Sequence, residues 1–274
     1  MSKPVGISYS GGTSSEWLVR SVIAGVIPRP ENVAVFCADT KDEHWWTYEA
    51  MDRVEVACHN AGIPFFRDSH REGLAESVMA ATRGERKRID TPPFWTENQG
   101  GGRGQLTQQC SEVFKTAVVR RMQSAWLKSI GLPKKITTWI GFAADEQHRA
   151  NKAIARKDVQ WVDLDFPAIR YGAVRAQQRA DVTRWAGRAP HFSMCVQCPY
   201  KTPNRWRQTD ASDLVKAYEV DEAIRHGLEN IGVDGPCYLS DRLIPVEALI
   251  RNGDPQPSLP GLDAPGCDGG ACFL

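Results

Sequence analysis

The chain has 274 residues, of which 42% are hydrophobic and 24% charged, and its net charge at pH 7 is +1. These values are typical of a globular protein with one large domain, or with one domain and an appended smaller one, and they exclude a disordered or fibrous chain. The sequence shows no apolar run long enough to cross a membrane and no amino-terminal export signal, so we expect a cytoplasmic protein without a membrane partner.

The charges are unevenly distributed along the chain. Residues 101–160 contain eleven Lys or Arg and four Asp or Glu, whereas residues 211–274 contain four and eleven. The basic middle of the chain suits a polyanion such as a nucleotide, a tRNA or a DNA, although solvated helical faces would give the same excess.

The first element combines a strand, a glycine turn and a helix. Residues 5–9 alternate as in a strand, and residues 16–23 carry an apolar stripe with helical spacing. The junction between them, together with Ser8 on the strand, offers backbone amides and hydroxyls to a phosphate. An ordinary turn with a serine helix cap is the alternative. The junction residues are Ser10, Gly11, Gly12, Thr13, Ser14 and Ser15.

Strands and helices then alternate along the chain. Further strands are predicted over residues 32–40, 63–66, 136–142 and 161–166, and further helices over residues 43–61, 73–82, 111–130 and 175–186. This alternation predicts an α/β fold with a doubly wound, mostly parallel sheet. We expect a nucleotide-binding domain over residues 1–170 and a smaller, mainly helical, Cys-containing region over residues 171–274.

Polar residues follow two of the predicted strands. Asp39 and Thr40 follow the second strand, and Gly141 and Asp145 follow a later one. Ligands gather at the carboxyl edge of a parallel sheet, so these residues are candidates for nucleotide binding, with simple turn formation as the alternative. Residues 84–109 lack periodicity and suggest a substrate lid, in which Phe94 and Trp95 could stack on a ligand, or a disordered excursion.

The eight cysteines favour metal or thiol chemistry over disulfides in a chain without an export signal. Cys195 and Cys198 form a CxxC pair followed by Pro199, a spacing that can hold a metal or cluster. Cys110, Cys267 and Cys272 are further candidate ligands. The remaining cysteines, Cys37, Cys58 and Cys237, are predicted to be buried packing residues.

The stretch from Ser10 to Ser15 resembles the SGGxxS signature of the PP-loop ATP pyrophosphatases, and within them the phosphoadenosine phosphosulfate (PAPS) reductase family; Ser14 stands where that signature usually has an acidic residue. Further blocks resemble this family in consistent order over nearly the whole chain: residues 109–115, 141–149, 195–206 and 238–245. The resemblance implies an adenine nucleotide alpha hydrolase-like fold.

The resemblance also implies the ligands. Cys110, Cys195 and Cys198 would hold a [4Fe-4S] cluster, whose fourth position would be open or closed by Cys272 or Cys267; a Zn²⁺ site with the same thiolates is the alternative. ATP, or a sulfonucleotide, would bind with Mg²⁺. The loop amides, Lys115 and Arg149 would stabilise the phosphates, and Cys272 could carry sulfur as a persulfide.

The leading functional hypothesis is an ATP-dependent adenylating sulfur-transfer enzyme that acts on a nucleic acid or nucleotide, with a sulfur-donor protein and a second copy of the chain as candidate partners. A sulfonucleotide (PAPS or APS) reductase that uses a carboxyl-terminal cysteine is the main alternative. A non-enzymatic nucleotide-binding component of a defence or modification system is the third.

Overall fold

The computed structural model describes residues 3–87, 92–98, 100–156 and 159–251. Within these ranges, no helix is both long and apolar enough to cross a bilayer.

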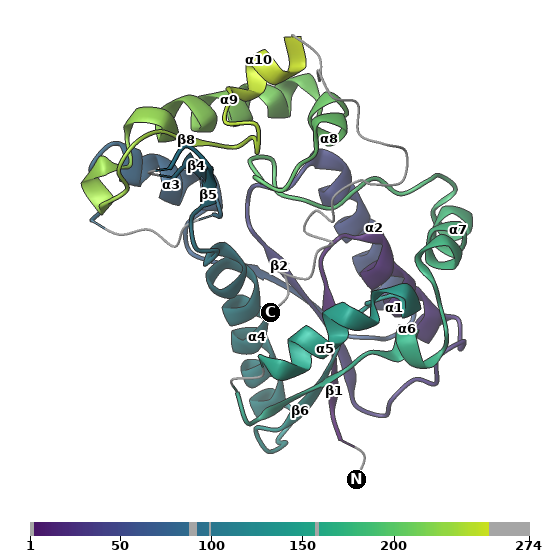
Figure 1. Ribbon diagram of the computed structural model, residues 1–274. Helices are drawn as coiled ribbons and strands as arrows, with labels where there is room; N and C mark the ends of the chain where they lie inside the picture. The colour runs from purple at the N-terminus through teal and green to yellow at the C-terminus, as the bar shows by residue number, and fades with distance from the viewer. Residues whose placement is uncertain (1–2, 88–91, 99, 157–158, 252–274) are drawn as a thin grey trace.

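A five-stranded parallel sheet forms the centre of the molecule (Figure 1), in the order β3-β2-β1-β6-β7. Every residue of the central strand β1 is buried, which explains its apolar sequence. The prediction of a parallel α/β sheet is therefore confirmed. The strands are β1 (Val5–Tyr9), β2 (Val33–Asp39), β3 (Phe65–Ser69), β6 (Ile136–Trp139) and β7 (Val162–Asp165).

The strand order reverses direction at β1. The chain passes from β1 through β2 to β3 on one side, then returns to place β6 and β7 on the other side. A crevice forms at the carboxyl ends of the strands where such a reversal occurs. The glycine turn after β1 therefore lies where this architecture binds ligands.

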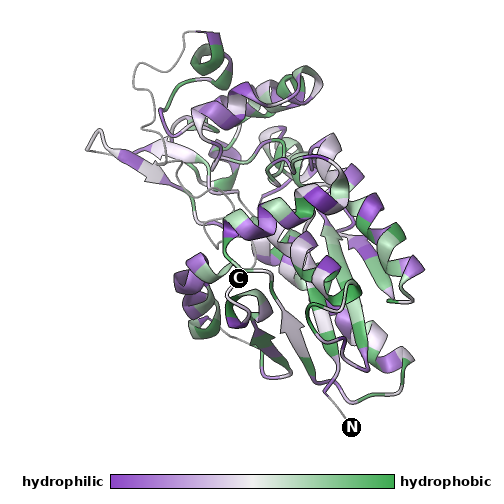
Figure 2. Cartoon of the chain, turned by 90° about the vertical axis from the view of Figure 1, so that its right-hand side faces the viewer, coloured by the Kyte–Doolittle hydropathy of each residue, from purple (hydrophilic) through white to green (hydrophobic). Residues whose placement is uncertain are grey.

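Helices cover both faces of the sheet (Figures 1 and 2). Helices α1 (Thr13–Ile23), α2 (Trp45–Asn60) and α7 (Arg175–Ala186) share one apolar core with β1, while α4 (Ala117–Ser129) packs on the opposite face of β2. The short helix α6 (Pro167–Arg170) follows β7, and α5 (Gln147–Ala155) contributes to a smaller apolar cluster around Phe142.

A second, mainly helical core lies beyond the carboxyl edge of the sheet, at the top of Figure 1. Its centre includes Trp206, which is fully buried. The core is built from α3 (Leu74–Thr82), α8 (Pro203–Arg207), α9 (Ala211–His226), the 3₁₀ turn η3 (Glu229–Ile231), α10 (Val246–Arg251) and a small antiparallel sheet of β4 (Trp95–Glu97), β5 (Arg103–Gln105) and β8 (Cys237–Tyr238).

The segment from residue 84 to residue 109 is therefore not a lid without regular structure. Strands β4 and β5 pair as an antiparallel hairpin, and β4 also pairs with β8. Phe94 is fully buried in the second core, and the Trp95 indole donates a hydrogen bond to the Pro199 carbonyl at 2.9 Å. The expectation that these two rings stack on a substrate is wrong, because Phe94 packs inside the second core and Trp95 is held against the Pro199 backbone. Residues 88–91 and 99 lie outside the described residues.

The predicted helix over residues 111–130 begins with a π-helical turn, η1 (Glu112–Thr116), before it continues as α4. Helical spacing puts Lys115, Arg120 and Arg121 on the side opposite the apolar stripe of this helix, yet Lys115 is buried. A π turn contains an additional residue, so the side chains before it face a different direction from those after it. The predicted strands and helices otherwise differ from the observed ones mainly at their ends.

Candidate functional site

The glycine turn leaves the start of α1 open to a ligand. Gly11 has φ +73°, a conformation that other residues rarely adopt, and Gly12 caps α1 without any side-chain hydrogen bond. The first amides of the helix therefore keep their donors for an anion. The Ser15 hydroxyl accepts a hydrogen bond from the Ser10 amide at 3.3 Å and donates to the Gly12 carbonyl at 3.0 Å, which closes the loop on itself.

This loop forms one wall of a pocket of about 250 Å³, which we call the phosphate pocket. The predicted binding residues Ser8, Ser10, Gly12, Thr13, Ser14, Ser15 and Gly141 line it; Gly11 does not. The opposite walls carry the cationic side chains of Lys115, Arg149, Arg175, Arg179 and Arg205. A pocket with hydroxyls and helix amides on one side and five cations on the other is suited to a polyphosphate.

Gly141 is required by the close approach of two backbones. A Cβ atom at this position would lie 2.4 Å from the Ser14 carbonyl oxygen. Glycine therefore lets the chain after β6 pass directly against the first turn of α1.

Glu146 positions two of the arginines that line the phosphate pocket. It lies at the end of the 3₁₀ turn η2 (Ala144–Glu146), forms ion pairs with Arg149 and Arg175, and accepts a hydrogen bond from the Ala143 amide at 2.9 Å. Burial by itself would raise the pKa of Glu146, but the two guanidinium groups outweigh it and the pKa is lowered. The Arg149 guanidinium also lies 4.2 Å from the centre of the Phe142 ring.

Asp145, the acidic residue predicted to meet the nucleotide, does not line the phosphate pocket. Its side chain is exposed and accepts a hydrogen bond from the Arg175 amide at 3.0 Å, which fixes the start of α7. The neighbouring Glu146 has the buried position instead, because a 3₁₀ turn has three residues per turn and successive side chains therefore point in directions about 120° apart.

A second pocket of about 330 Å³ adjoins the first, and we call it the base pocket. It is predominantly apolar, lies between α4 and α5 over the sheet, and includes side chains such as Val119 and Leu164. The two pockets share Ser8, Ser10, Lys115 and Ile140, so they are continuous. The wall of the base pocket also contains the polar pair Gln123 and Thr138, in which the Gln123 amide donates a hydrogen bond to the Thr138 hydroxyl at 2.9 Å.

The structure brings together the three predicted ligands that fall within the described residues. Cys110, Cys195 and Cys198 line one small cavity of about 20 Å³, although they come from the start of the helix before α4 and from the turn before α8. Burial raises the pKa of all three thiols, that of Cys198 to about 11. We call this the cysteine cavity. Cys267 and Cys272 lie outside the described residues.

No group of three or more His, Cys, Asp and Glu side chains in the described ranges is arranged to hold a metal ion.

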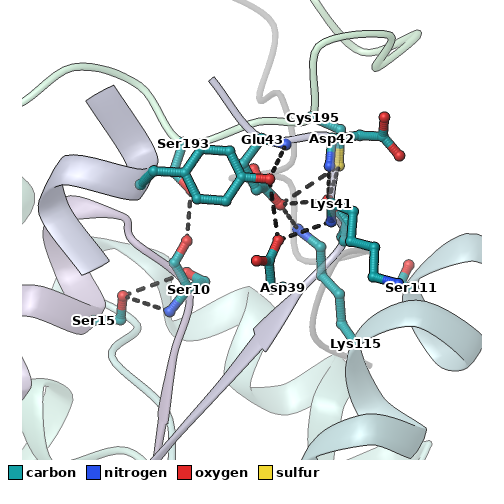
Figure 3. A network of polar contacts seen from close by, with 12 residues as sticks. Ser10, Ser15, Asp39, Lys41, Asp42, Glu43, Ser111, Lys115, Ser193 and Cys195 are labelled. Carbon is teal, nitrogen blue, oxygen red and sulfur yellow. Dashed lines mark hydrogen bonds and ion pairs between the residues drawn. The ribbon is translucent and has the colours of Figure 1, made fainter. Parts of the chain in front are cut away.

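Lys115 lies where the three spaces meet, since it lines the phosphate pocket, the base pocket and the cysteine cavity. Its ammonium forms an ion pair with Glu43, drawn in Figure 3, and lies 3.3 Å from the Oε1 atom. Burial by itself would lower the pKa of Lys115, but the charge of Glu43 and the nearby thiols outweigh it, and the pKa is raised. Lys115 therefore carries its positive charge between the two pockets and the cysteines.

Glu43 is a site residue that the sequence analysis missed. Its Oε1 atom accepts a hydrogen bond from the Thr40 hydroxyl at 3.1 Å and lies 3.7 Å from the Cys195 sulfur, while its Oε2 atom is buried without a hydrogen-bond partner. An isolated antiparallel bridge also pairs the backbones of Glu43 and Cys195. In the sequence, Glu43 is simply an acidic residue at the start of a predicted helix, and no local pattern distinguishes it.

Asp39 and Thr40 do not line the phosphate or base pocket, contrary to the expectation that they face the nucleotide. Asp39 accepts hydrogen bonds from the Lys41 amide and the Tyr48 hydroxyl and forms an ion pair with Arg67 at 3.3 Å. The strand order reverses between β1 and β6, and β2 lies on the far side of β1 from β6; of β2, only Ala38 lines the base pocket. Thr40 instead lines the cysteine cavity.

Residues 191–198 connect the phosphate pocket to the cysteine cavity. Ser193 donates a hydrogen bond to the Ser10 carbonyl at 2.8 Å, and two residues later Cys195 lines the cysteine cavity. The sequence analysis missed the pocket residues His191, Phe192 and Ser193, together with Arg175, Arg179 and Arg205. These arginines belong to residues 161–210, which contain eight Lys or Arg and four Asp or Glu, and this basic excess was the one available signal for them.

Neither a protein-family model nor a curated protein sequence matches the chain. Among solved structures, the chain is similar to the U34-tRNA thiolase NcsA from Methanococcus maripaludis with its [4Fe-4S] cluster, at 13% identity and a TM-score of 0.42, over 99% of this chain and 80% of that one. It is also similar to a PAPS reductase from Candida auris in a phosphate complex, at 14% identity and a TM-score of 0.41, over 70% of this chain and 76% of that one. The strand order β3-β2-β1-β6-β7 and the glycine turn after the central strand agree with the doubly wound, parallel α/β fold that the sequence predicts.

Proposed function

We propose that the protein is an ATP-dependent sulfur-transfer enzyme that adenylates a nucleic acid or nucleotide and uses a [4Fe-4S] cluster. The observation that carries this proposal is the position of Lys115, whose side chain borders the phosphate pocket, the base pocket and the cysteine cavity at once. The Lys115 ammonium would therefore lie next to both the bound polyphosphate and the cysteines that would hold the cluster.

In this proposal, each of the two pockets binds a different part of the nucleotide. The phosphate pocket supplies helix amides, hydroxyls and arginines to the polyphosphate, and Mg²⁺ would be held mainly by phosphate oxygens. The apolar base pocket takes a planar ring. The α-phosphate would then lie near Ser8, Ser10 and Lys115, where the pockets join.

The cysteine cavity has a donor set suited to an iron–sulfur cluster. Its three thiols are buried, and binding to iron would replace their protons and stabilise the thiolates that burial disfavours. Cys110, Cys195 and Cys198 would hold the cluster, with Cys267 or Cys272 as candidates for its fourth position. Such a cluster, when bound, would present sulfur to the activated acceptor.

The residues of the chain would promote the adenylation step by electrostatics. A carbonyl oxygen of the acceptor would attack the α-phosphorus, and the bond to the pyrophosphate oxygen would break. The α1 amides, Arg149 and Lys115 would stabilise the negative charge that develops on the leaving pyrophosphate. Sulfide-level sulfur from the sulfur donor would then form a bond to the acceptor carbon, and the bond from that carbon to the AMP oxygen would break, so the step needs no oxidant.

Anaerobic purification followed by iron and acid-labile sulfide analysis tests the cluster. We expect about four irons per chain, as the formula of the cluster requires, and loss of iron in Cys110→Ser and Cys198→Ser but not in Cys237→Ser. Cys237 is buried in the second core and does not line the cysteine cavity. Zinc in place of iron would contradict the cluster proposal.

Radiolabelled ATP tests the reaction. With an RNA or DNA acceptor and a sulfide source, we expect release of AMP and pyrophosphate by the wild-type protein and none by Lys115→Met. Sulfite release from labelled adenylyl sulfate without ATP turnover would instead identify a sulfonucleotide reductase. ATP binding without turnover of any substrate would identify a nucleotide-binding component.

A further inference from the structure

Three aromatic rings form a continuous stack beside the phosphate pocket. The His44 and Trp46 ring centres lie 4.2 Å apart with an angle of 18° between the planes, and Trp46 and His191 lie 5.0 Å apart at 25°. We call these rings the aromatic stack. The rings come from the start of α2 and from the segment before the CxxC turn, so the tertiary structure alone assembles them.

The inner end of the stack is held rigidly. His44 is fully buried, and its Nδ1 atom lies 2.6 Å from Asp213 on α9. The Trp46 indole donates a hydrogen bond to the Phe192 carbonyl at 2.8 Å. A planar group that stacks on the outer end would therefore meet a surface that is already ordered, which lowers the entropic cost of binding.

The outer end of the stack is open to solvent and borders the phosphate pocket. His191 is exposed and lines that pocket. Trp45 stands beside it at 6.4 Å between ring centres and is 49% exposed. Trp45 and Tyr171 are the two aromatic residues among the exposed large hydrophobic side chains of the described ranges, and Tyr171 lines neither the phosphate pocket nor the base pocket.

The charges around this open end favour an anionic partner. Arg179 and Arg205 line the phosphate pocket beside His191, and Arg205 also lies 5.6 Å from the centre of the Phe192 ring. The nearby carboxylate of Glu49 is paired with Arg188 at 2.5 Å. Exposed rings next to arginines are the combination that binds unpaired nucleotides, because each base offers a face and each phosphate a charge.

We propose that the outer face of the aromatic stack, formed by His191 with Trp45 at its edge, binds an unpaired base of a single-stranded nucleic acid and so holds the strand beside the nucleotide. This inference rests on the proposed function and names the surface that receives its acceptor. The stack continues outward by one base, and the positive charge of the adjoining phosphate pocket, to which Arg179 and Arg205 contribute, attracts the anionic strand. A base-paired strand cannot dock in this way because its faces are already stacked.

Fluorescence anisotropy with a 5′-fluorescein-labelled 12-nucleotide oligouridylate tests the proposal at one fixed salt concentration. We expect Trp45→Ala and His191→Ala each to weaken binding at least about fivefold, the lower range for loss of one base–aromatic stack. Trp45→Phe should retain most of the affinity, and Tyr171→Ala should bind like the wild-type protein.

Two further probes separate stacking from charge. An abasic strand of the same length carries the same phosphates, so it should bind the wild-type protein more weakly than oligouridylate and should be insensitive to Trp45→Ala. An unlabelled duplex should not displace the labelled strand. Equal binding of the abasic strand, displacement by the duplex, or no binding of oligouridylate would each overturn the proposal.

ATP binding separates this inference from the proposed function. Trp45 lines neither pocket, so Trp45→Ala should bind ATP like the wild-type protein. If ATP binds and oligouridylate binds independently of Trp45, only the aromatic surface is refuted. If the wild-type protein does not bind ATP at all, the proposed function itself fails.

Discussion

Lys115 and Glu43 are buried charges that depend on each other. Their charged atoms lie 3.3 Å apart, and both side chains are close to fully buried. Removing one partner of such a pair leaves the other charge buried and unpaired, which lowers the free energy of unfolding by about 3 to 5 kcal/mol. Effects of Lys115 on activity must therefore be separated from effects on stability.

Lys115→Met should abolish pyrophosphate release and lower the free energy of unfolding by about 3 kcal/mol, because Glu43 loses its counter-charge. The double variant Lys115→Met/Glu43→Gln should recover much of the stability but none of the activity. Urea unfolding and a pyrophosphate assay measure the two effects. Lys128→Met, at an exposed position of α4, should change neither. Restored activity in the double variant would refute the role given to Lys115.

Glu146 should make the stability of the protein depend on acid pH. Its pKa is lowered in the folded state, so its stabilising effect is fully present above the unfolded-state pKa of about 4.3 and is lost as the pH falls through the lower folded-state value. Glu146→Gln should therefore cost about 3 kcal/mol at pH 7 and progressively less below pH of about 4.

Urea unfolding at several pH values measures this dependence. Glu247→Gln serves as the control, since Glu247 is about half exposed and pairs with Arg251 on the surface, where an ion pair contributes about 0.5 kcal/mol or less. A constant difference between Glu146→Gln and the wild-type protein at all pH values would contradict the predicted ionisation.

Among the elements, the close crossing of the segment after β6 with the start of α1 shapes the phosphate pocket. Gly141→Ala would place a methyl group 2.4 Å from the Ser14 carbonyl, so the first turn of α1 would have to move. We expect a loss of about 1 to 3 kcal/mol in stability, as for other overpacked sites, and weaker ATP binding by calorimetry. Gly102→Ala should affect neither, because no heavy atom lies within 4 Å of the added group. Unchanged ATP affinity in Gly141→Ala would refute the proposal that the first amides of α1 bind the phosphates of ATP.

At the scale of the whole molecule, the second core holds the CxxC turn against the sheet domain. Val196, inside the turn, packs in that core with Trp206 and Leu239. Asp221 joins three elements of the core: it accepts hydrogen bonds from the Leu239 amide at 2.9 Å and the Val246 amide at 3.0 Å, and it pairs with Arg225 on its own helix.

Asp221→Asn should lower the free energy of unfolding by about 2 kcal/mol, because an amide cannot accept all three hydrogen bonds and leaves a buried donor unpaired. Thermal and urea unfolding measure this loss. Glu222→Gln, at the next and exposed position of α9, should be neutral. Equal stability of both variants would show that Asp221 does not join these elements.

The sequence predicted the parts of the site that depend on local pattern. The glycine turn after β1 and the CxxC pair are contiguous, so spacing alone identified them, and Gly141 was found by its place after a strand. Asp39 and Asp145 were predicted by the same rule and do not line the phosphate pocket. The rule identifies the edge of a sheet but not which side chains turn into the crevice. The metal, the acceptor, the role of Cys267 and Cys272 and the domain boundary at residue 170 remain predictions.

The sequence by itself determined the parallel α/β sheet, the glycine turn and the presence of thiols, because each follows from periodicity or spacing within a few residues. Only the tertiary structure decided that Cys110 meets Cys195 and Cys198, that Lys115 is buried against Glu43, and that His191 completes a stack begun by His44. These contacts join residues far apart in the chain. Their formation depends on how helices pack across the sheet edge and on one π turn, neither of which leaves a local pattern in the sequence.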